Sequence, residues 1–164
     1  MATGHAATAA TIELTRLGVA FTMHPYAHDP AEHSFGDEAA RVLGLSPDEV
    51  FKTLVVMVDD APTVAVLPVS ARLDMKALAA CCGGRRAELA DLALAQRLTG
   101  YVIGGISPIG QKRQLPTLID EQAWLHDVVY VSGGKRGLDI GLAPADLIRA
   151  TSGTIAAIAR AEPS

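Results

Sequence analysis

Apolar residues fall into many short runs separated by glycine, proline and polar residues. Their helical spacing predicts helices over residues 7–17, 37–43, 74–82, 91–98 and 143–150, with a further helical turn at 46–49. Alternating or β-branched runs predict strands over 19–24, 52–58, 63–69, 117–119, 128–131, 138–142 and 154–158. The segment Asp59-Asp60-Ala61-Pro62 is typical of a hairpin connection. Short strands interleaved with short helices predict one α/β (α+β) domain over residues 1–164, built around a mixed, curved sheet.

Composition narrows the class of protein. Hydrophobic residues make up 49% of the 164 residues, enough for a substantial core, which excludes a disordered chain. The net charge of −4 argues against broad, non-specific binding of nucleic acid. The doublets Arg85-Arg86, Lys112-Arg113 and Lys135-Arg136 still allow a local basic face. No apolar stretch approaches the length of a membrane span, and residues 1–10 show no secretory signal, so we expect no membrane association.

The only two cysteines, Cys81 and Cys82, are adjacent in an alanine-rich segment. Neighbouring cysteines pair only with strained geometry, and the chain offers no other partner. A reduced, cytoplasmic protein follows most simply. We expect both thiols to be small buried or half-buried side chains and not nucleophiles.

Two glycine- and serine-containing segments, residues 104–110 and 132–137, each follow a β-like apolar run, Tyr101-Val102-Ile103 and 128–131. Glycine allows a ligand to approach the backbone N–H groups closely. Neither segment fits a dinucleotide-binding or P-loop pattern. Two such segments, each with a serine and a basic pair, favour a polar binding cleft over a pair of structural turns.

Lys52 begins the apolar strand 52–58. A lysine at the edge of a run destined for the core loses part of its hydration, which makes it a candidate for holding an anion or polarising a carbonyl. The alternative is a strand-end lysine that extends its ammonium to solvent.

Three histidines and two carboxylates within residues 24–33 are of the right types for a metal site. Pro25 interrupts the interval and prevents a regular ligand-bearing face, so a metal hydrolase is a minor alternative. Catalysis by a Ser–His–Asp triad through Ser107 or Ser132 is possible by composition, but there is no Gly-x-Ser-x-Gly motif.

Four runs of sequence together resemble the YbaK/EbsC family, whose best-known member is the bacterial Cys-tRNA(Pro) deacylase and which is related to the editing domain of prolyl-tRNA synthetase. They are Tyr26 through Phe35-Gly36-Asp37-Glu38, Val50-Phe51-Lys52-Thr53-Leu54, Gly100 to Pro108, and Tyr130 to Ile140. The similarity spans roughly residues 8–160 in the same motif order. It implies a partly barrel-like sheet flanked by helices, and hydrolysis of the ester that joins a wrong amino acid to tRNA.

The resemblance also implies a site without a metal, another cofactor or a protein nucleophile, in which the substrate's own thiol attacks the ester. It assigns catalytic positions to Lys52, Gly104 and Gly105, and substrate-binding positions to Tyr26, Phe35, Thr53, Ser107, Ser132 and Asp139. The implied partners are the acceptor end of mischarged tRNA(Pro) and prolyl-tRNA synthetase. A non-catalytic module that binds an acceptor end or a nucleotide remains the alternative of a different class.

Overall fold

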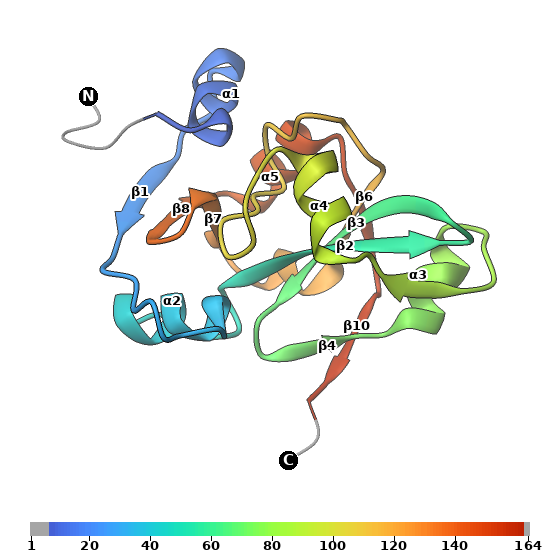
Figure 1. Ribbon diagram of the computed structural model, residues 1–164. Coiled ribbons are helices and arrows are strands. Elements are labelled where there is room, and N and C mark those ends of the chain that lie inside the picture. The colour runs from blue at the N-terminus through green and yellow to red at the C-terminus, as the bar shows by residue number, and fades with distance from the viewer. Residues whose placement is uncertain (1–6, 163–164) are drawn as a thin grey trace.

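The computed structural model describes residues 7–162, which form helices packed around three β-sheets (Figure 1). The helices are α1 (Ala9–Leu17), α2 (Phe35–Leu43), α3 (Met75–Cys81), α4 (Leu92–Thr99), α5 (Pro144–Thr151) and the 3₁₀ helix η1 (Glu121–Leu125). The strands are β1 (Thr22–Pro25), β2 (Phe51–Val58), β3 (Ala61–Pro68), β4 (Ala71–Leu73), β5 (Ala87–Leu89), β6 (Thr117–Asp120), β7 (Val129–Lys135), β8 (Leu138–Leu142), β9 (Thr154–Ala156) and β10 (Ala159–Ala161).

The largest sheet has the strand order β5-β2-β3-β6-β9. Its β2–β3 and β2–β5 pairs are antiparallel, whereas β3–β6 and β6–β9 are parallel. An antiparallel sheet β1-β8-β7 lies beside it, and β10 pairs with β4 at the C-terminal end of the described chain. The predicted mixed α+β fold is confirmed; among residues 7–162 the strands form no closed barrel.

The central strand β3 explains why the sheet has a core on both faces. Val64 and Val66 belong to the cluster that also holds Leu14 of α1 and Leu147 of α5. Ala65, between them, points to the other face and joins a second cluster with Val56, Leu78 and Ile158. Successive side chains on a strand alternate between faces, so a strand buried on both faces is apolar throughout.

Local signals placed most helix ends correctly. Helices α1, α2 and α4 each end at a glycine with positive φ, and Asp74 and Asp91 cap α3 and α4 by accepting a backbone N–H. The β2–β3 hairpin is confirmed, but its turn is tighter than predicted. Asp59 and Asp60 alone form it, both with positive φ, because a two-residue turn of this kind matches the twist of the strands.

Several sequence predictions were wrong in detail. The run 101–103 is not a strand: the N–H of Ile103 donates to Oε1 of Gln96, and the C=O of Val102 accepts from Gly105 in a turn. Conversely, Ser132 to Lys135 is not a loop, because β7 continues through it with a bulge opposite β8. The first predicted strand begins only at Thr22 and includes Pro25. Residues 46–49 form a hydrogen-bonded turn and no helix.

The two cysteines are both exposed, which corrects the expectation that they would be buried. They lie where α3 ends, and Gly83 follows with a positive φ. Within the described residues, no helix combines the length and the apolar character needed to cross a membrane.

Candidate functional site

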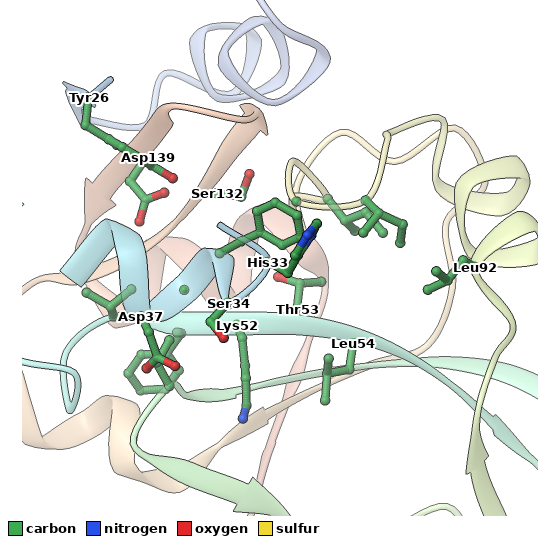
Figure 2. A pocket seen from close by; sticks show the side chains of 18 residues that line it. Tyr26, His33, Ser34, Asp37, Lys52, Thr53, Leu54, Leu92, Ser132 and Asp139 are labelled. Carbon is green, nitrogen blue, oxygen red and sulfur yellow. The ribbon is translucent and has the colours of Figure 1, made fainter. Parts of the chain in front are cut away.

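A cleft of about 440 Å³ lies along the first half of β2. Strand β5 pairs with β2 only from Val56 to Val58, and β7 bridges the chain at Val50, just before β2 begins. No strand among residues 7–162 is paired with the edge of β2 from Phe51 to Leu54 on that side. The start of α2, the segment around Gly104 and the β7–β8 hairpin surround this open edge (Figure 2). The fold thereby leaves a polar cleft where a sheet would otherwise continue.

Seven of the nine predicted site residues line this cleft. They are Tyr26, Phe35, Lys52, Thr53, Gly104, Ser132 and Asp139. They come from four separate parts of the chain, and the structure brings them together.

The structure does not bring Gly105 and Ser107 to the cleft. The N–H of Gly105 already donates to the C=O of Val102 at 2.9 Å, so it is not available to a substrate oxyanion. Ser107 is fully buried, and its Oγ accepts from the N–H of Ile109 at 3.2 Å. Both residues shape the segment that carries Gly104, which is a structural contribution.

The two glycine-containing segments meet one another. A Cβ on Gly105 would lie 2.6 Å from Cα of Lys135, so only glycine permits this approach of the two backbones. The side chain of Arg136 crosses the same junction, and its Nε donates to the C=O of Ile103 at 2.7 Å. The predicted cleft therefore has a physical basis: the segments pack against each other and close one side of it.

One wall of the cleft carries Tyr26, Ser132 and Asp139 (Figure 2). Asp139 is paired with Ser132 across the β7–β8 ladder and is 5% exposed. Burial raises the pKa of its carboxyl to about 7. Burial also raises the pKa of Tyr26 to about 12, and the charge of Asp139 adds to this effect. A carboxyl in such surroundings is suited to hold a cation or to exchange a proton near neutral pH.

The opposite wall is β2 itself. Thr53 and Lys52 project to opposite faces of the strand, and Figure 2 shows the Lys52 ammonium directed away from Ser132 and Asp139. The Lys52 Nζ donates to the C=O of Ala71 at 2.9 Å, and partial burial lowers its pKa. Thr53 Oγ1 is buried without a hydrogen-bond partner, the only such side-chain atom among the described residues.

A hydrogen-bonded pair of His28 and the buried Glu38 fixes the segment that carries Tyr26 and Phe35. Glu38 is 1% exposed. Its carboxylate accepts a hydrogen bond from the N–H of Asp29 at 2.9 Å and lies 2.6 Å from Nδ1 of His28. Burial raises the pKa of Glu38, but these hydrogen bonds outweigh it and the net pKa is lowered. The His28 ring also packs on Phe35, with the ring centroids 5.6 Å apart.

Sequence reasoning missed several residues of the site. His33, Ser34 and Asp37 line the cleft, and Arg136 borders it. The signal was present, since Asp37 and Arg136 lie inside the motifs that carry the family resemblance. His24 instead bonds to Thr22 and His28 to Glu38, and nowhere in residues 7–162 do three metal-ligating side chains of His, Cys, Asp or Glu gather.

The model of the aminoacyl-tRNA editing domain family matches residues 29–150. The chain belongs to this family. A protein of Enterococcus faecalis, EbsC, for which a Cys-tRNA(Pro)/Cys-tRNA(Cys) deacylase activity is proposed, is 39% identical over 132 residues, 80% of each chain. The predicted YbaK/EbsC resemblance is confirmed, and with it the class of enzyme, an aminoacyl-tRNA deacylase.

More distant relatives agree with this placement. A proline–tRNA ligase of Maridesulfovibrio salexigens is 26% identical over 108 residues, which are 66% of this chain and 18% of the ligase. The crystal structure of hypothetical protein APE2540 superposes with a TM-score of 0.80 at 24% identity, over 90% of this chain and 96% of its own. A proposed trans-editing enzyme for prolyl-tRNA synthetase superposes with a TM-score of 0.75 at 24% identity, over 85% of this chain and 87% of its own. At these identities the two structures show the fold alone.

Proposed function

We propose that this protein hydrolyses the ester bond of mischarged Cys-tRNA(Pro) as a free-standing editing enzyme. The observation that carries the proposal is the cleft at the open edge of β2, which gathers Thr53, Ser132, Asp139 and Gly104 around a space of about 440 Å³. That volume suits one nucleoside with its aminoacyl group. The relative from Enterococcus faecalis, 39% identical, supports the choice of cysteine as the amino acid.

The wall formed by Asp139 and Ser132 would hold the amino acid. An aminoacyl ester carries an α-ammonium group, and Asp139 offers a buried carboxylate for it. Pairing with this ammonium would favour the ionised form of Asp139, whose pKa is otherwise raised to about 7 by burial. Ser132 lies opposite Asp139 in the ladder and adds a hydroxyl that can donate or accept.

The ester itself would lie between Gly104 and β2. With Gly105 engaged in a turn, we assign the N–H of Gly104, which lines the cleft, to the developing oxyanion. Thr53 lines the cleft, and its buried hydroxyl, which has no partner in the described protein, can donate a second hydrogen bond once rotation of the side chain turns it into the cleft. The Lys52 ammonium lies on the other face of β2 from Thr53 (Figure 2). We therefore assign its two N–H groups beyond the one bonded to Ala71 to an oxygen of the terminal ribose at that edge of the cleft, and not to the ester carbonyl.

The reaction would use the thiol of the substrate. The cysteinyl sulfur forms a bond to its own carbonyl carbon, and the bond from that carbon to the ribose oxygen breaks. The ribose oxygen takes up the proton that the thiol has lost, and water then opens the resulting β-thiolactone to free cysteine. Orientation of a nucleophile already attached to the substrate can lower the barrier by about 7–11 kcal/mol, so the protein need only fix the geometry.

The direct test is release of free cysteine from Cys-tRNA(Pro), measured for the wild type and for Lys52→Met. We expect turnover by the wild type and a loss of about 100-fold in Lys52→Met, because one stabilising cation is removed from the site. The methionine keeps the aliphatic stem, so folding should lose only about 1 kcal/mol with the bond to Ala71. Lys76→Met, an exposed lysine of α3, is the matched control and should keep full activity.

Two other outcomes of these assays would each support a different function. Tight binding of the acceptor end without release of cysteine would favour a non-catalytic binding module. Loss of activity with a chelator would favour a metal hydrolase on the histidine-containing segment 24–33. Addition of prolyl-tRNA synthetase to the assay tests the partner, because an acidic chain with a net charge of −4 can gain its selection of tRNA(Pro) from that enzyme.

A further inference from the structure

Arg136 is an exposed arginine that the protein nevertheless holds in place. It lies in the turn between β7 and β8. Its Nε donates to the C=O of Ile103 at 2.7 Å, and its guanidinium carbon lies 5.2 Å from the centroid of the Phe35 ring. Two contacts, one hydrogen bond and one cation–π interaction, therefore hold the group in place.

Most of its hydrogen-bonding capacity is unused. A guanidinium has five N–H donors, and the bond to Ile103 takes one. Among residues 7–162, none of the ion pairs includes Arg136, and its terminal nitrogens donate to no other group. The entropy of ordering this long side chain is already lost in the free protein, which is the arrangement that favours tight binding of an oxyanion.

The guanidinium borders the cleft. Gly104 and Phe35 both line it, and a Cβ on Gly104 would lie 2.9 Å from Nε of Arg136 and 2.7 Å from the Phe35 ring. Arg136 therefore lies immediately beside the part of the wall to which we assign the ester, but outside the cleft. Its free donors are available to a group that remains at the mouth.

We infer that Arg136 binds the 5′-phosphate of the terminal nucleotide of the RNA substrate. The inference rests on the proposed function. A cleft of about 440 Å³ takes the terminal nucleoside and its amino acid, so the phosphate attached to that nucleoside must stay near the rim. The protein as a whole is acidic, with a net charge of −4, so the phosphate needs a local cation. A planar guanidinium with two free amino groups matches a phosphate in a bidentate manner.

The test uses two minimal substrates, adenosine carrying a 3′-cysteinyl ester, with and without a 5′-phosphate. We expect the wild type to show a kcat/KM about 10- to 100-fold higher for the phosphorylated ester, the range given by a hydrogen-bonded charge pair. Arg136→Met should remove this difference, mainly through KM; loss of the bond to Ile103 affects both esters alike, so the ratio of the two kcat/KM values isolates the phosphate contact.

Arg85→Met is the matched control. It removes the same charge from a residue whose backbone N–H donates to Asp59, at the far end of the β2–β3 hairpin, about 20 Å along the strand from Lys52. It should keep the preference for the phosphorylated ester. An equal loss on both esters in Arg136→Met would show that the residue only braces Ile103 and Phe35, and the inference would be wrong. It would be equally wrong if the wild type showed no preference, or if Lys52→Met abolished the preference and Arg136→Met did not.

Binding measurements separate this inference from the proposed function. If the wild type releases no cysteine from either ester or from Cys-tRNA(Pro), the proposed function fails. The phosphate site is then judged by calorimetric titration with adenosine 5′-monophosphate and with adenosine. Tighter binding of the monophosphate by the wild type, with the difference lost in Arg136→Met, supports the site without any activity. Equal affinities, or no binding of either compound, overturn it.

Discussion

The Thr53 hydroxyl is buried on the cleft side of β2 and has no hydrogen-bond partner in the described protein. An unpaired buried hydroxyl costs about 1–3 kcal/mol, so Thr53→Val should leave the free energy of unfolding unchanged or raise it. The same change should lower kcat/KM about 10-fold, because the substrate oxygen loses its donor. Chemical denaturation and the release of cysteine measure the two effects.

Thr53→Ser is the control for this prediction, since it keeps the hydroxyl and removes only a methyl group. It should retain most of the activity. A valine variant that is both as active as the wild type and less stable would show that the hydroxyl serves packing alone, and Thr53 would leave the proposed binding site.

Asp139 makes the stability of the fold depend on pH. Burial raises its folded-state pKa to about 7, whereas an unfolded aspartate titrates near its ordinary value of about 3.9. Between these values the folded state retains a proton that the unfolded state has released, so stability falls as pH rises from about 4 to 7 and changes little above. The loss is on the order of 1–4 kcal/mol, because each unit of pKa shift corresponds to about 1.4 kcal/mol.

Asp139→Asn should remove this dependence, so its stability relative to the wild type should be greater at pH 8 than at pH 5. Urea denaturation of both proteins at the two pH values measures the difference. The deacylase activity of Asp139→Asn should be low at both pH values, because an amide cannot form an ion pair with the substrate ammonium. Parallel stability profiles for the two proteins would mean that Asp139 is ionised in the folded state at pH 5.

At the level of elements, the contact between Gly105 and the β7–β8 turn decides the shape of the site. A Cβ at Gly105 would overlap backbone atoms of Lys135, which cannot move aside as a flexible side chain can. Gly105→Ala should therefore cost about 1–3 kcal/mol of stability and, by displacing Gly104, lower activity even where the protein is fully folded. Thermal unfolding and kcat/KM at 20 °C below the transition measure both.

Gly18→Ala is the companion variant, because Gly18 ends α1 in a left-handed conformation with no atom within 4 Å of a Cβ. It should lose about 1 kcal/mol of stability and no activity. Equal activity of both variants when folded would contradict the proposed coupling between Gly105 and the cleft.

The elements that the sequence predicted well are those determined by neighbours in the chain. Helix caps such as Asp74 and Asp91 and the Asp59-Asp60 hairpin act within a few residues. The run 101–103 was misassigned because its hydrogen bonds come from Gln96 and from its own turn. The short strands β4, β5 and β10 were missed because three residues carry little pattern, and their partners lie far away along the chain.

Some residues of the candidate site could likewise be predicted from the sequence, and others could not. Lys52, Gly104 and Asp139 could be found from strand ends, glycine segments and motif order. The position of Arg136 over Phe35 could not, because it depends on how the β7–β8 turn approaches α2. Neither could the engagement of the Gly105 N–H, which only the backbone path of residues 102–105 reveals.

At the scale of the whole molecule, the fold separates the protein's own thiols from the cleft. Cys81 and Cys82 end α3, which packs on β5 beside the Val56–Val58 end of β2, and neither lines the cleft at the other end of that strand. Desolvation and the neighbouring Cys81 raise the pKa of the Cys82 thiol, so little of it is ionised at neutral pH. A thiol nucleophile in the cleft must then come from the substrate, and water is the alternative that the proposed reaction has to be tested against.

The last prediction distinguishes these two sources. Cys81→Ser combined with Cys82→Ser should keep near-normal release of cysteine from Cys-tRNA(Pro), since no protein thiol reaches the ester. Ser-tRNA(Pro), which differs from the cysteinyl ester by one atom, should be hydrolysed far more slowly, because a hydroxyl is hardly ionised at neutral pH and oxygen is less polarisable than sulfur. A cleft that activates water would discriminate between the two esters by only about 1–3 kcal/mol. Single-turnover rates for both esters at saturating enzyme therefore decide the mechanism: comparable rates would exclude thiol assistance, and inactivity of the folded double variant would return the nucleophile to the protein.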